Sequence, residues 1–552
     1  MINAIQVISV VLILGTTILI AKLIAPYLVR VYNRAPGRLD KVLNPIENFI
    51  YKICSIDPEH PMGWKQYFLT GLLLNVAQMV IAFIILVFQD KLPLNPLGFP
   101  GLSWDLSFNT VISFATNTNL QHYNGEATLS IFSQMTAIQF LQWISAATGI
   151  CMGIAFIRGF IVGSKNVGNF HVDFVRTITR ILVPLCLIAS VVFLVMGVPQ
   201  TLNASTAVTT LQGTTQSILV GPVASLDSIM QLGTNGGGFY GANAAYPFMN
   251  PSPSSDIFMI ALMLLLPTAV IFVFGELLGK KKESRPLLWG AYIFVGINLA
   301  IAFVPNIPLV AEGIETRFGG FMSTLYTVIT TVATTGSVNS ALSGMHPLAI
   351  TSGFMGMFVQ AIPGGKGVGL MYMVMFVIIT VFIVGLMSGR TPEYLGIKIT
   401  GRDVKLVMVA FLIHPIIILV PTVMAYASGA AAAVGVSGNS VGYTQILWEF
   451  TSAAANNGSD FLGSSANTPF FNIATGIVMF IGRYAPLAIL LALSGSMIGR
   501  KRTGTTSGLK TDSPIFTIVL IGSIIILVVL TFFPFLALGP ISSFFGGLKN
   551  GF

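Results

Sequence analysis

Residues 235–250 read NGGGFYGANAAYPFMN, and residues 457–472 read NGSDFLGSSANTPFFN. The two stretches share Asn, Gly, Phe, Gly, Pro, Phe and Asn in the same order and at the same spacing, without a gap. Such internal repetition indicates a fold built from repeated copies of one structural unit. Each copy lies between apolar segments, so the predicted unit is an apolar segment, a short helix, a polar loop and a second apolar segment.

Two further loops have the same composition as these copies. Each of the four has a mostly uncharged stretch of helix length, followed by a cluster of Thr, Asn, Ser and Gly. Ordinary surface loops would need neither the preceding apolar helix nor a matching copy elsewhere in the chain. We therefore predict four units in one chain, which can surround a central axis without a homotetramer. The clusters are TNTNLQ (116–121), GTNGGG (233–238), TTGSVN (334–339) and NNGSD (456–460).

The composition predicts an all-α integral membrane protein. Of 552 residues, 54% are hydrophobic and only 9% are charged, whereas about 25% of the residues of a soluble domain are charged. Ten segments are apolar over roughly the ~20 residues that a membrane helix needs. The first lacks the basic start and the cleavage site of a signal peptide, so we expect a retained helix. The segments are residues 5–24, 67–88, 132–161, 178–198, 257–278, 287–304, 348–387, 404–425, 470–497 and 515–536.

The basic residues predict the orientation. Alternate loops are rich in Lys and Arg, while the loops between them carry only Lys91 and Arg317. The positive-inside rule places the basic loops in the cytoplasm, and ten spans then leave both termini outside. Because the net charge of +9 is spread over these short clusters, it indicates topology and not nucleic-acid binding. The basic loops are residues 25–65, 158–180, 280–285, 390–405 and 500–510.

The predicted organisation follows from the spans and the loops. Four pore repeats use eight of the ten helices, and one extra helix lies at each end. The predicted parts are an N-terminal helix and cytoplasmic loop (1–65), pore repeat 1 (66–170), pore repeat 2 (171–285), pore repeat 3 with a broken second helix (286–402), pore repeat 4 (403–510) and a C-terminal helix (511–552).

The four polar clusters suit a monovalent cation. Non-helical backbone inside a membrane is tolerated where it lines a cavity, and there its carbonyl groups become ligands. A short helix that ends at such a loop directs the negative end of its dipole towards the axis. A divalent ion would prefer carboxylates, and Asp460 is the only carboxylate in the clusters. Neutral oxygens therefore predict potassium.

The candidate ligands are the polar and glycine residues of these clusters. We expect no catalytic residue and no metal ion other than K+, because the three cysteines and five histidines have no spacing typical of a disulfide framework or a metal cluster. The predicted filter residues are Asn117, Thr118, Asn119, Gln121, Thr234, Asn235, Gly236, Thr334, Thr335, Gly336, Asn456, Asn457 and Gly458.

Three basic residues and two glycines are candidates for a gate or a subunit interface. The seventh apolar segment is about twice the usual length, and Gly364, Gly365 and Lys366 lie at its break. A lysine inside a span costs at least ~2.5 kcal/mol unless it finds water or a partner. This loop is either a gate or a re-entrant loop with a packing role. Arg483, near mid-membrane, faces a cavity or an interface, whereas Arg390 is either a topology anchor or an interface residue.

Five motifs resemble the potassium-binding A subunit of the Kdp potassium-importing ATPase of bacteria and archaea. The resemblance runs over the full length of the chain, and the second and third motifs given below are specific to that family. Two positions differ from the family: Gln360 stands where an acidic residue is expected, and Lys366 where an apolar one is expected. The motifs are FATNTN (114–119), GTNGGGF (233–239), GRTPEYLG (389–396), ANNGS (455–459) and SGS (494–496).

The resemblance implies a function and partners. It implies ten helices with four pseudo-symmetric pore repeats, related to potassium channels and Trk-type transporters. It also implies high-affinity potassium uptake at the inner membrane of a prokaryotic cell. The expected partners are a P-type ATPase B subunit, a small C subunit and a single-span F subunit, besides membrane lipid. The family further suggests a gate below the third filter and a position for Arg483 near the pumping subunit.

The chain shows no motif for ATP hydrolysis of its own. GGKG (364–367) lacks the spacing and the Ser/Thr of a nucleotide-binding P-loop, and no DKTGT block is present for an aspartyl-phosphate. A pump built on this chain would use the ATPase of a partner, and we expect no cofactor in the chain itself. The alternative is a Trk/Ktr-like transporter or channel that works without ATP, and a remote third is a non-transporting scaffold.

Overall fold

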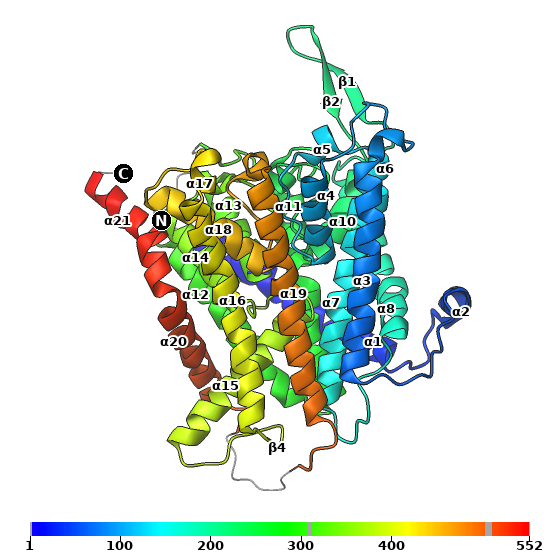
Figure 1. The fold of residues 1–552 in the computed structure, drawn as a ribbon, viewed down its shortest axis with the longest axis vertical. Helices are drawn as coiled ribbons and strands as arrows, with labels where there is room; N and C mark the ends of the chain where they lie inside the picture. The colour runs from blue at the N-terminus through cyan, green and yellow to red at the C-terminus, as the bar shows by residue number, and fades with distance from the viewer. Residues whose placement is uncertain (1–2, 306–311, 503–509, 551–552) are drawn as a thin grey trace.

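The computed structural model describes residues 3–305, 312–502 and 510–550, so the ends of the predicted segments 1–65 and 511–552 lie outside the described residues. Within them, ten helical stretches are long and apolar enough to cross a membrane, which confirms the predicted number (Figure 1). They are α1 (Ala4–Tyr32), α3 (Trp64–Val87), Ile131–Gly159, Phe170–Val195, α11 (Pro253–Leu277), Lys281–Phe303, α15 (Val368–Met387), α16 (Gly401–Ala427), α19 (Pro469–Met497) and α20 (Pro514–Leu538).

Three of these stretches are composite. The first comprises α6 (Ile131–Ser133), a π-helical turn (Gln134–Gln139) and α7 (Phe140–Gly159). The second comprises α8 (Phe170–Arg176), a π-helical turn (Thr177–Leu182) and α9 (Val183–Val195). In the third, a 3₁₀ turn (Lys281–Glu283) precedes α12 (Ser284–Phe303).

Four short buried helices stand between the spans, as the sequence predicts. Figure 1 places them in the upper half of the bundle. Each packs against the helices of its own repeat and also against a helix of the preceding repeat: α4 on α19, α10 on α7, α13 on α11, and α18 on α14. These contacts close a ring, so the four repeats surround one axis. The helices are α4 (Trp104–Ala115), α10 (Val223–Leu232), α13 (Gly319–Val332), α18 (Ser440–Ala454) and the flanking α14 (Pro347–Val359).

The long seventh apolar segment is broken, as its Pro and Gly residues predict. Helix α14 ends at Val359 and α15 begins at Val368. Gln360, Gly364 and Gly367 have positive φ angles of 52°, 73° and 76°. Residues 360–366 are buried and non-helical, an arrangement that survives at membrane depth only inside the protein or beside a cavity.

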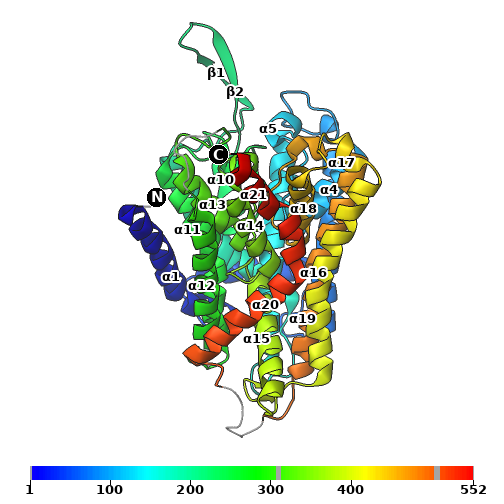
Figure 2. The same ribbon diagram turned by 90° about the vertical axis from the view of Figure 1, so that its left-hand side faces the viewer.

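The exposure of the spans shows where the core lies. In the most apolar window of the Ile131–Gly159 stretch 89% of the residues are buried, against 11% for α1. The second helix of repeat 1 is therefore central, and α1 lies at the periphery, where it packs along α11 (Figure 2).

Several elements go beyond the predicted spans. Helix α1 continues past residue 24 to Tyr32, and an amphipathic helix, α2 (Asp40–Ile53), follows it. The hairpin of β1 (Ser205–Thr209) and β2 (Thr215–Leu219) projects from the top of the molecule (Figures 1 and 2). The remaining short elements are β3 (Glu393–Tyr394), β4 (Ile397–Lys398), α5 (Gly125–Thr128), α17 (Ala430–Ala433), α21 (Pro540–Asn550), and 3₁₀ turns at Gln89–Lys91, Asn243–Ala245, Leu342–Gly344 and Gly463–Ala466.

Candidate functional site

All four pore helices end with the same backbone geometry. The second residue after each helix has a positive φ angle: 64° at Asn117, 43° at Thr234, 47° at Thr334 and 51° at Asn456. The next residue then turns back and donates its N–H to the carbonyl five positions earlier. By this common geometry, residues 334–336 of the third loop correspond to residues 117–119, 234–236 and 456–458 of the other loops. The N···O distances are 2.9 Å for Thr118–Ser113, 2.8 Å for Asn235–Met230, 2.8 Å for Thr335–Thr330 and 2.9 Å for Asn457–Ser452.

The four loops meet at Gly236. A Cβ atom placed on this glycine would lie 2.6 Å from the carbonyl oxygens of Thr118 and Asn457. It would also lie 2.8 Å from the carbonyl oxygen of Thr335. Each of these oxygens comes from a different loop, and Gly236 itself belongs to the second loop. Backbone carbonyls from three repeats therefore converge on the loop of the remaining repeat, the type of coordination that replaces the hydration shell of a potassium ion.

Amide side chains hold adjacent loops together. Asn117 Nδ2 donates to the carbonyl of Thr234 at 2.6 Å, which ties the first loop to the second. Gln121 makes a two-way contact with Gly238: its Nε2 donates to the carbonyl and its Oε1 accepts from the backbone N–H, both at 3.0 Å. Asn456 Nδ2 donates to Thr118 Oγ1 at 2.9 Å and joins the fourth loop to the first. These side chains support the ring of carbonyls laterally.

Three other predicted ligands have side-chain oxygens that accept no hydrogen bond from the described residues. Asn119 Oδ1, Thr234 Oγ1 and Thr335 Oγ1 are buried and, within the described parts of the chain, have no hydrogen-bond partner. A buried polar atom without a partner is costly. An ion or an ordered water in the filter would satisfy all three.

The non-helical segment 360–367 lies against two of the pore-helix ends. Gly364 donates its N–H to the carbonyl of Val332, at the end of α13, at 2.9 Å. A Cβ atom on Gly365 would lie 2.8 Å from Thr334 Oγ1 and 3.9 Å from Thr234 Oγ1. The predicted gate residues Gly364 and Gly365 therefore border the second and third filter loops.

Lys366 places its ammonium group beside the second pore helix. Its Nζ would lie 3.2 Å from a Cβ atom on Gly233, the residue that caps α10. The residue is 1% exposed, and Nζ has no hydrogen-bond partner among the residues that the structure describes. The negative end of the α10 dipole favours a cation at this position, but it leaves most of the cost of burying the ammonium uncompensated.

Arg483 and the backbone of Lys366 both lie against Gly149, whereas Arg390 lies beyond the far end of α15. A Cβ atom on Gly149, in α7, would lie 2.7 Å from a guanidinium nitrogen of Arg483 and 3.0 Å from the carbonyl oxygen of Lys366. Arg483 is 6% exposed and donates to the carbonyl of Ser145 at 3.4 Å. Arg390 is exposed just beyond the far end of α15, a helix of 20 residues that spans about 30 Å.

A buried polar cluster joins residues of repeats 1 and 4, and it was not predicted from the sequence. His122 Nε2 lies 3.1 Å from Glu449 Oε1, and His122 Nδ1 lies 2.7 Å from Asn472 Oδ1. Asn472 Nδ2 also donates to Asp105 Oδ2 at 2.9 Å. The sequence repeat contained a hint of this cluster, because Asn472 is the last residue of the copied stretch. Its counterpart in the other copy, Asn250, also donates to a carboxylate, with Nδ2 2.8 Å from Asp256 Oδ1.

Burial acts on two titratable groups here, His122 of the cluster and Asp460, which interacts with the charges of His122 and Glu449. It raises the pKa of Asp460 to about 7, and the charge of Glu449 acts in the same direction. For His122, burial lowers the pKa, but the hydrogen bond to Glu449 and the charge of that carboxylate outweigh it and raise the pKa above its ordinary value. His122 and Asp460 therefore both favour their protonated forms.

Comparison with known proteins agrees with this geometry. A sequence profile of the family described as potassium-transporting ATPase A subunit matches residues 11–545. The chain is 43% identical to the potassium-transporting ATPase potassium-binding subunit of Caldanaerobacter subterraneus subsp. tengcongensis, over 96% of this chain and 97% of that protein. It is 42% identical to the subunit of the same name from Gloeobacter violaceus, over 99% of each.

A solved structure shares the fold. The potassium transporter TrkH from Vibrio parahaemolyticus superposes with a TM-score of 0.52 at 15% identity, over 87% of this chain and 97% of that one. At this identity the likeness concerns the fold alone. The sequence profile spans nearly the whole described chain and both relatives match from end to end, so the chain belongs to the family of potassium-transporting ATPase A subunits.

Proposed function

We propose that this chain is the potassium-binding and translocating subunit of an ATP-driven, high-affinity potassium uptake complex. The observation that carries the proposal is the convergence of three carbonyl oxygens, from the first, third and fourth loops, on Gly236 of the second. Carbonyl rings of this type coordinate a dehydrated monovalent cation. The names of the two relatives, both potassium-binding subunits of a potassium-transporting ATPase, support the same function.

The filter in this proposal is built from the thirteen residues that the sequence predicts, as ligands or as supports. Thr118, Thr335 and Asn457 contribute carbonyl oxygens, and Asn119 and Thr234 contribute side-chain oxygens that are otherwise unpaired. Asn117, Gln121 and Asn456 position the loops and do not bind the ion through their amide nitrogens. The carbonyl ring needs no cofactor in this chain.

The ion leaves the filter beside the broken helix. In this proposal, residues 360–367 and the charges of Lys366 and Arg483 discourage straight passage through the membrane, because a fixed positive charge repels potassium. The ion would instead turn towards a neighbouring P-type ATPase B subunit, which hydrolyses the ATP. A small C subunit and a single-span F subunit complete the proposed complex in the inner membrane, with the basic loops in the cytoplasm.

The rival function is that of a Trk/Ktr-like transporter or channel that works without ATP. Purified chain should be reconstituted into liposomes alone and together with the other subunits, and rubidium uptake should be measured with and without ATP. We expect ATP-dependent uptake, inhibited by potassium and not by sodium, in the assembled complex only. A selective, ATP-independent flux through the chain alone would establish the rival function instead.

A further inference from the structure

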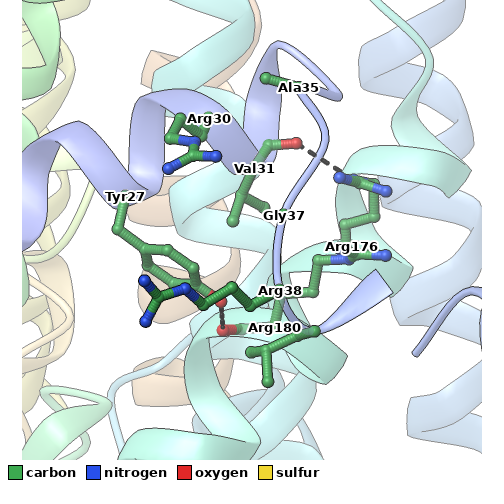
Figure 3. Close-up of a pocket in the computed structure, with 9 residues that line it drawn as sticks. Tyr27, Arg30, Val31, Ala35, Gly37, Arg38, Arg176 and Arg180 are labelled. Atoms are coloured by element: carbon green, nitrogen blue, oxygen red, sulfur yellow. Dashed lines mark hydrogen bonds between the residues drawn. The ribbon is translucent and has the colours of Figure 1, made fainter. Parts of the chain in front are cut away.

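An arginine-lined pocket lies between the end of α1, the loop that follows it and the stretch formed by α8 and its π-helical turn. The cavity has a volume of about 390 Å³, within the ~300–1,000 Å³ range of small-molecule sites. Figure 3 shows the arginines around it, with Tyr27 Oη donating to the carbonyl of Arg180 at 2.7 Å. The four arginines of the lining are Arg30, Arg38, Arg176 and Arg180.

Two of these arginines are neutralised and two are not. Arg180 binds Asp40 and Glu47, with a distance of 2.6 Å from its Nε to Glu47 Oε1. Arg176 binds the other oxygen of Glu47 at 3.1 Å. Arg30 and Arg38 have no acidic partner in the described parts of the chain, and both are exposed. Arg30 Nη2 donates to the carbonyl of Pro36 at 2.6 Å. The pocket therefore presents two guanidinium groups without an acidic partner, and guanidinium groups bind phosphate through paired N–H groups.

The surroundings of the pocket place it at the surface of a membrane. Residues 39–53 carry a stripe of exposed apolar side chains at helical spacing, while the opposite face of α2 holds Glu47, 2% exposed, against the arginines. A helix of this kind lies in the plane of the interface with its apolar face in lipid. Helix α1 is lipid-facing as well. The apolar stripe comprises Leu39, Val42, Ile46, Phe49 and Ile53, each between 43% and 65% exposed.

We propose that this pocket binds the phosphate headgroup of an anionic phospholipid. Arg30 and Arg38 contact the phosphate, and the acyl chains lie along the apolar faces of α1 and α2. The bound lipid joins the peripheral α1 to the Phe170–Val195 stretch of repeat 2, which contributes Arg176 and Arg180. A free phosphate would use the same guanidinium groups, but it would gain nothing from the adjoining apolar stripe.

The test replaces Arg30 and Arg38 by glutamine, which removes both positive charges. The full chain, as wild type and as the double variant Arg30→Gln/Arg38→Gln, is titrated with phosphatidylglycerol, phosphatidylcholine and inorganic phosphate, and binding is followed by native mass spectrometry and by the shift in Tm. The matched control is Lys41→Gln/Lys52→Gln, which removes the same charge from exposed positions on α2 outside the pocket lining.

Phosphatidylglycerol is expected to bind the wild type and the control and to raise their Tm. The double variant should nearly keep its lipid-free Tm, because neither arginine has an ion pair among the described residues and Arg30 loses one exposed hydrogen bond to Pro36. It should bind phosphatidylglycerol at least about tenfold more weakly. Equal loss in the control would show a diffuse charge effect and overturn the site. Unchanged binding by the double variant, or inorganic phosphate raising the Tm as much as the lipid, would overturn it too.

Discussion

At Gly236 the absence of a side chain is a requirement of the proposed filter. Any Cβ atom would come within 2.8 Å of carbonyl oxygens from three loops, which is closer than real Cβ contacts. The loops would have to move apart, and the ion would lose contact with them. The residue scale is therefore where selectivity is most easily tested.

Gly236→Ala is expected to raise the potassium concentration needed for half-maximal uptake by about tenfold or more, since each ~1.4 kcal/mol of lost coordination is a factor of ten. Uptake by the assembled complex should be measured against external potassium with rubidium and sodium as competitors. Gly438→Ala is the matched control, because a Cβ atom there meets nothing within 4 Å. An unchanged half-saturation value in Gly236→Ala would remove this residue from the filter.

Asp460 makes the stability of the chain depend on pH. Its pKa rises from 3.8 in the unfolded chain to about 7 in the folded one, so the folded state keeps a proton that the unfolded state has lost. Stability therefore falls as the pH rises from about 4 to about 7. His122, whose pKa is also raised, acts in the same direction: its contribution is complete below its unfolded pKa and disappears as the pH rises through its folded pKa.

Asp460→Asn should flatten this dependence. Because the amide cannot ionise, we expect the variant to exceed the wild type by on the order of 1–3 kcal/mol above about pH 7 and to match it near pH 4. Thermal unfolding in detergent across this range measures the difference. Asp90→Asn, at an exposed position after α3, serves as control. A wild-type slope in Asp460→Asn would show that this carboxyl group is ionised throughout.

The sequence predicts which residues form the proposed filter, but not which contacts each of them makes. Composition and the repeat indicate residues 117–121 and their counterparts, because oxygen-rich loops after short helices are a local pattern. The contact of Asn117 with the carbonyl of Thr234 joins two different repeats, and no local pattern encodes it. The same reason explains why the pairing of His122 with Glu449 was missed.

At the scale of the elements, the break between α14 and α15 is the feature with the clearest consequence. Pro363 and the neighbouring glycines made it predictable. The extension of α1 to Tyr32 was not predicted, because hydropathy falls before the helix ends and Arg30 simply turns to the surface. Helix α2 was missed because a search for spans overlooks amphipathic helices.

Lys366→Met tests whether the break acts as a gate. Removal of an unpaired buried ammonium should raise the Tm of the chain, and the loss of a positive charge below the filter should raise the apparent affinity for potassium several-fold. Both are measured on the assembled complex. Lys165→Met, an exposed lysine beyond α7, is the control. If the affinity stays at the wild-type value while the Tm rises, the segment has a packing role only.

At the scale of the whole molecule, the chain ends are informative. The start of α1 and the end of α21 lie in the same half of the bundle as the pore helices and the hairpin β1–β2 (Figures 1 and 2). An even number of spans requires the two ends to share a side. Fold class and span number followed from composition and hydropathy. The arginine pocket did not, because its lining comes from segments about 140 residues apart.

A reporter fused after Phe552, which lies outside the described residues, should be found on the external face. The positive-inside rule predicts that the basic loops lie in the cytoplasm, and ten spans would then return the chain to the outside. Accessibility of the reporter to a membrane-impermeant reagent in intact cells measures this, and a reporter placed in the loop at residues 390–405 should be protected. Protection at the C-terminus would mean an odd number of spans.

Because the ring is formed by four loops of different sequence in one chain, a mutation changes only one of the four loops. In a pore assembled from four identical chains, one codon change alters the ion ligands of all four subunits at once. Here Asn119 occupies the place that Gly236, Gly336 and Gly458 hold in the other loops, and each wall has its own codon. A single mutation can therefore adjust a quarter of the coordination shell while the other three quarters keep the ion, so selectivity can drift in small, survivable increments.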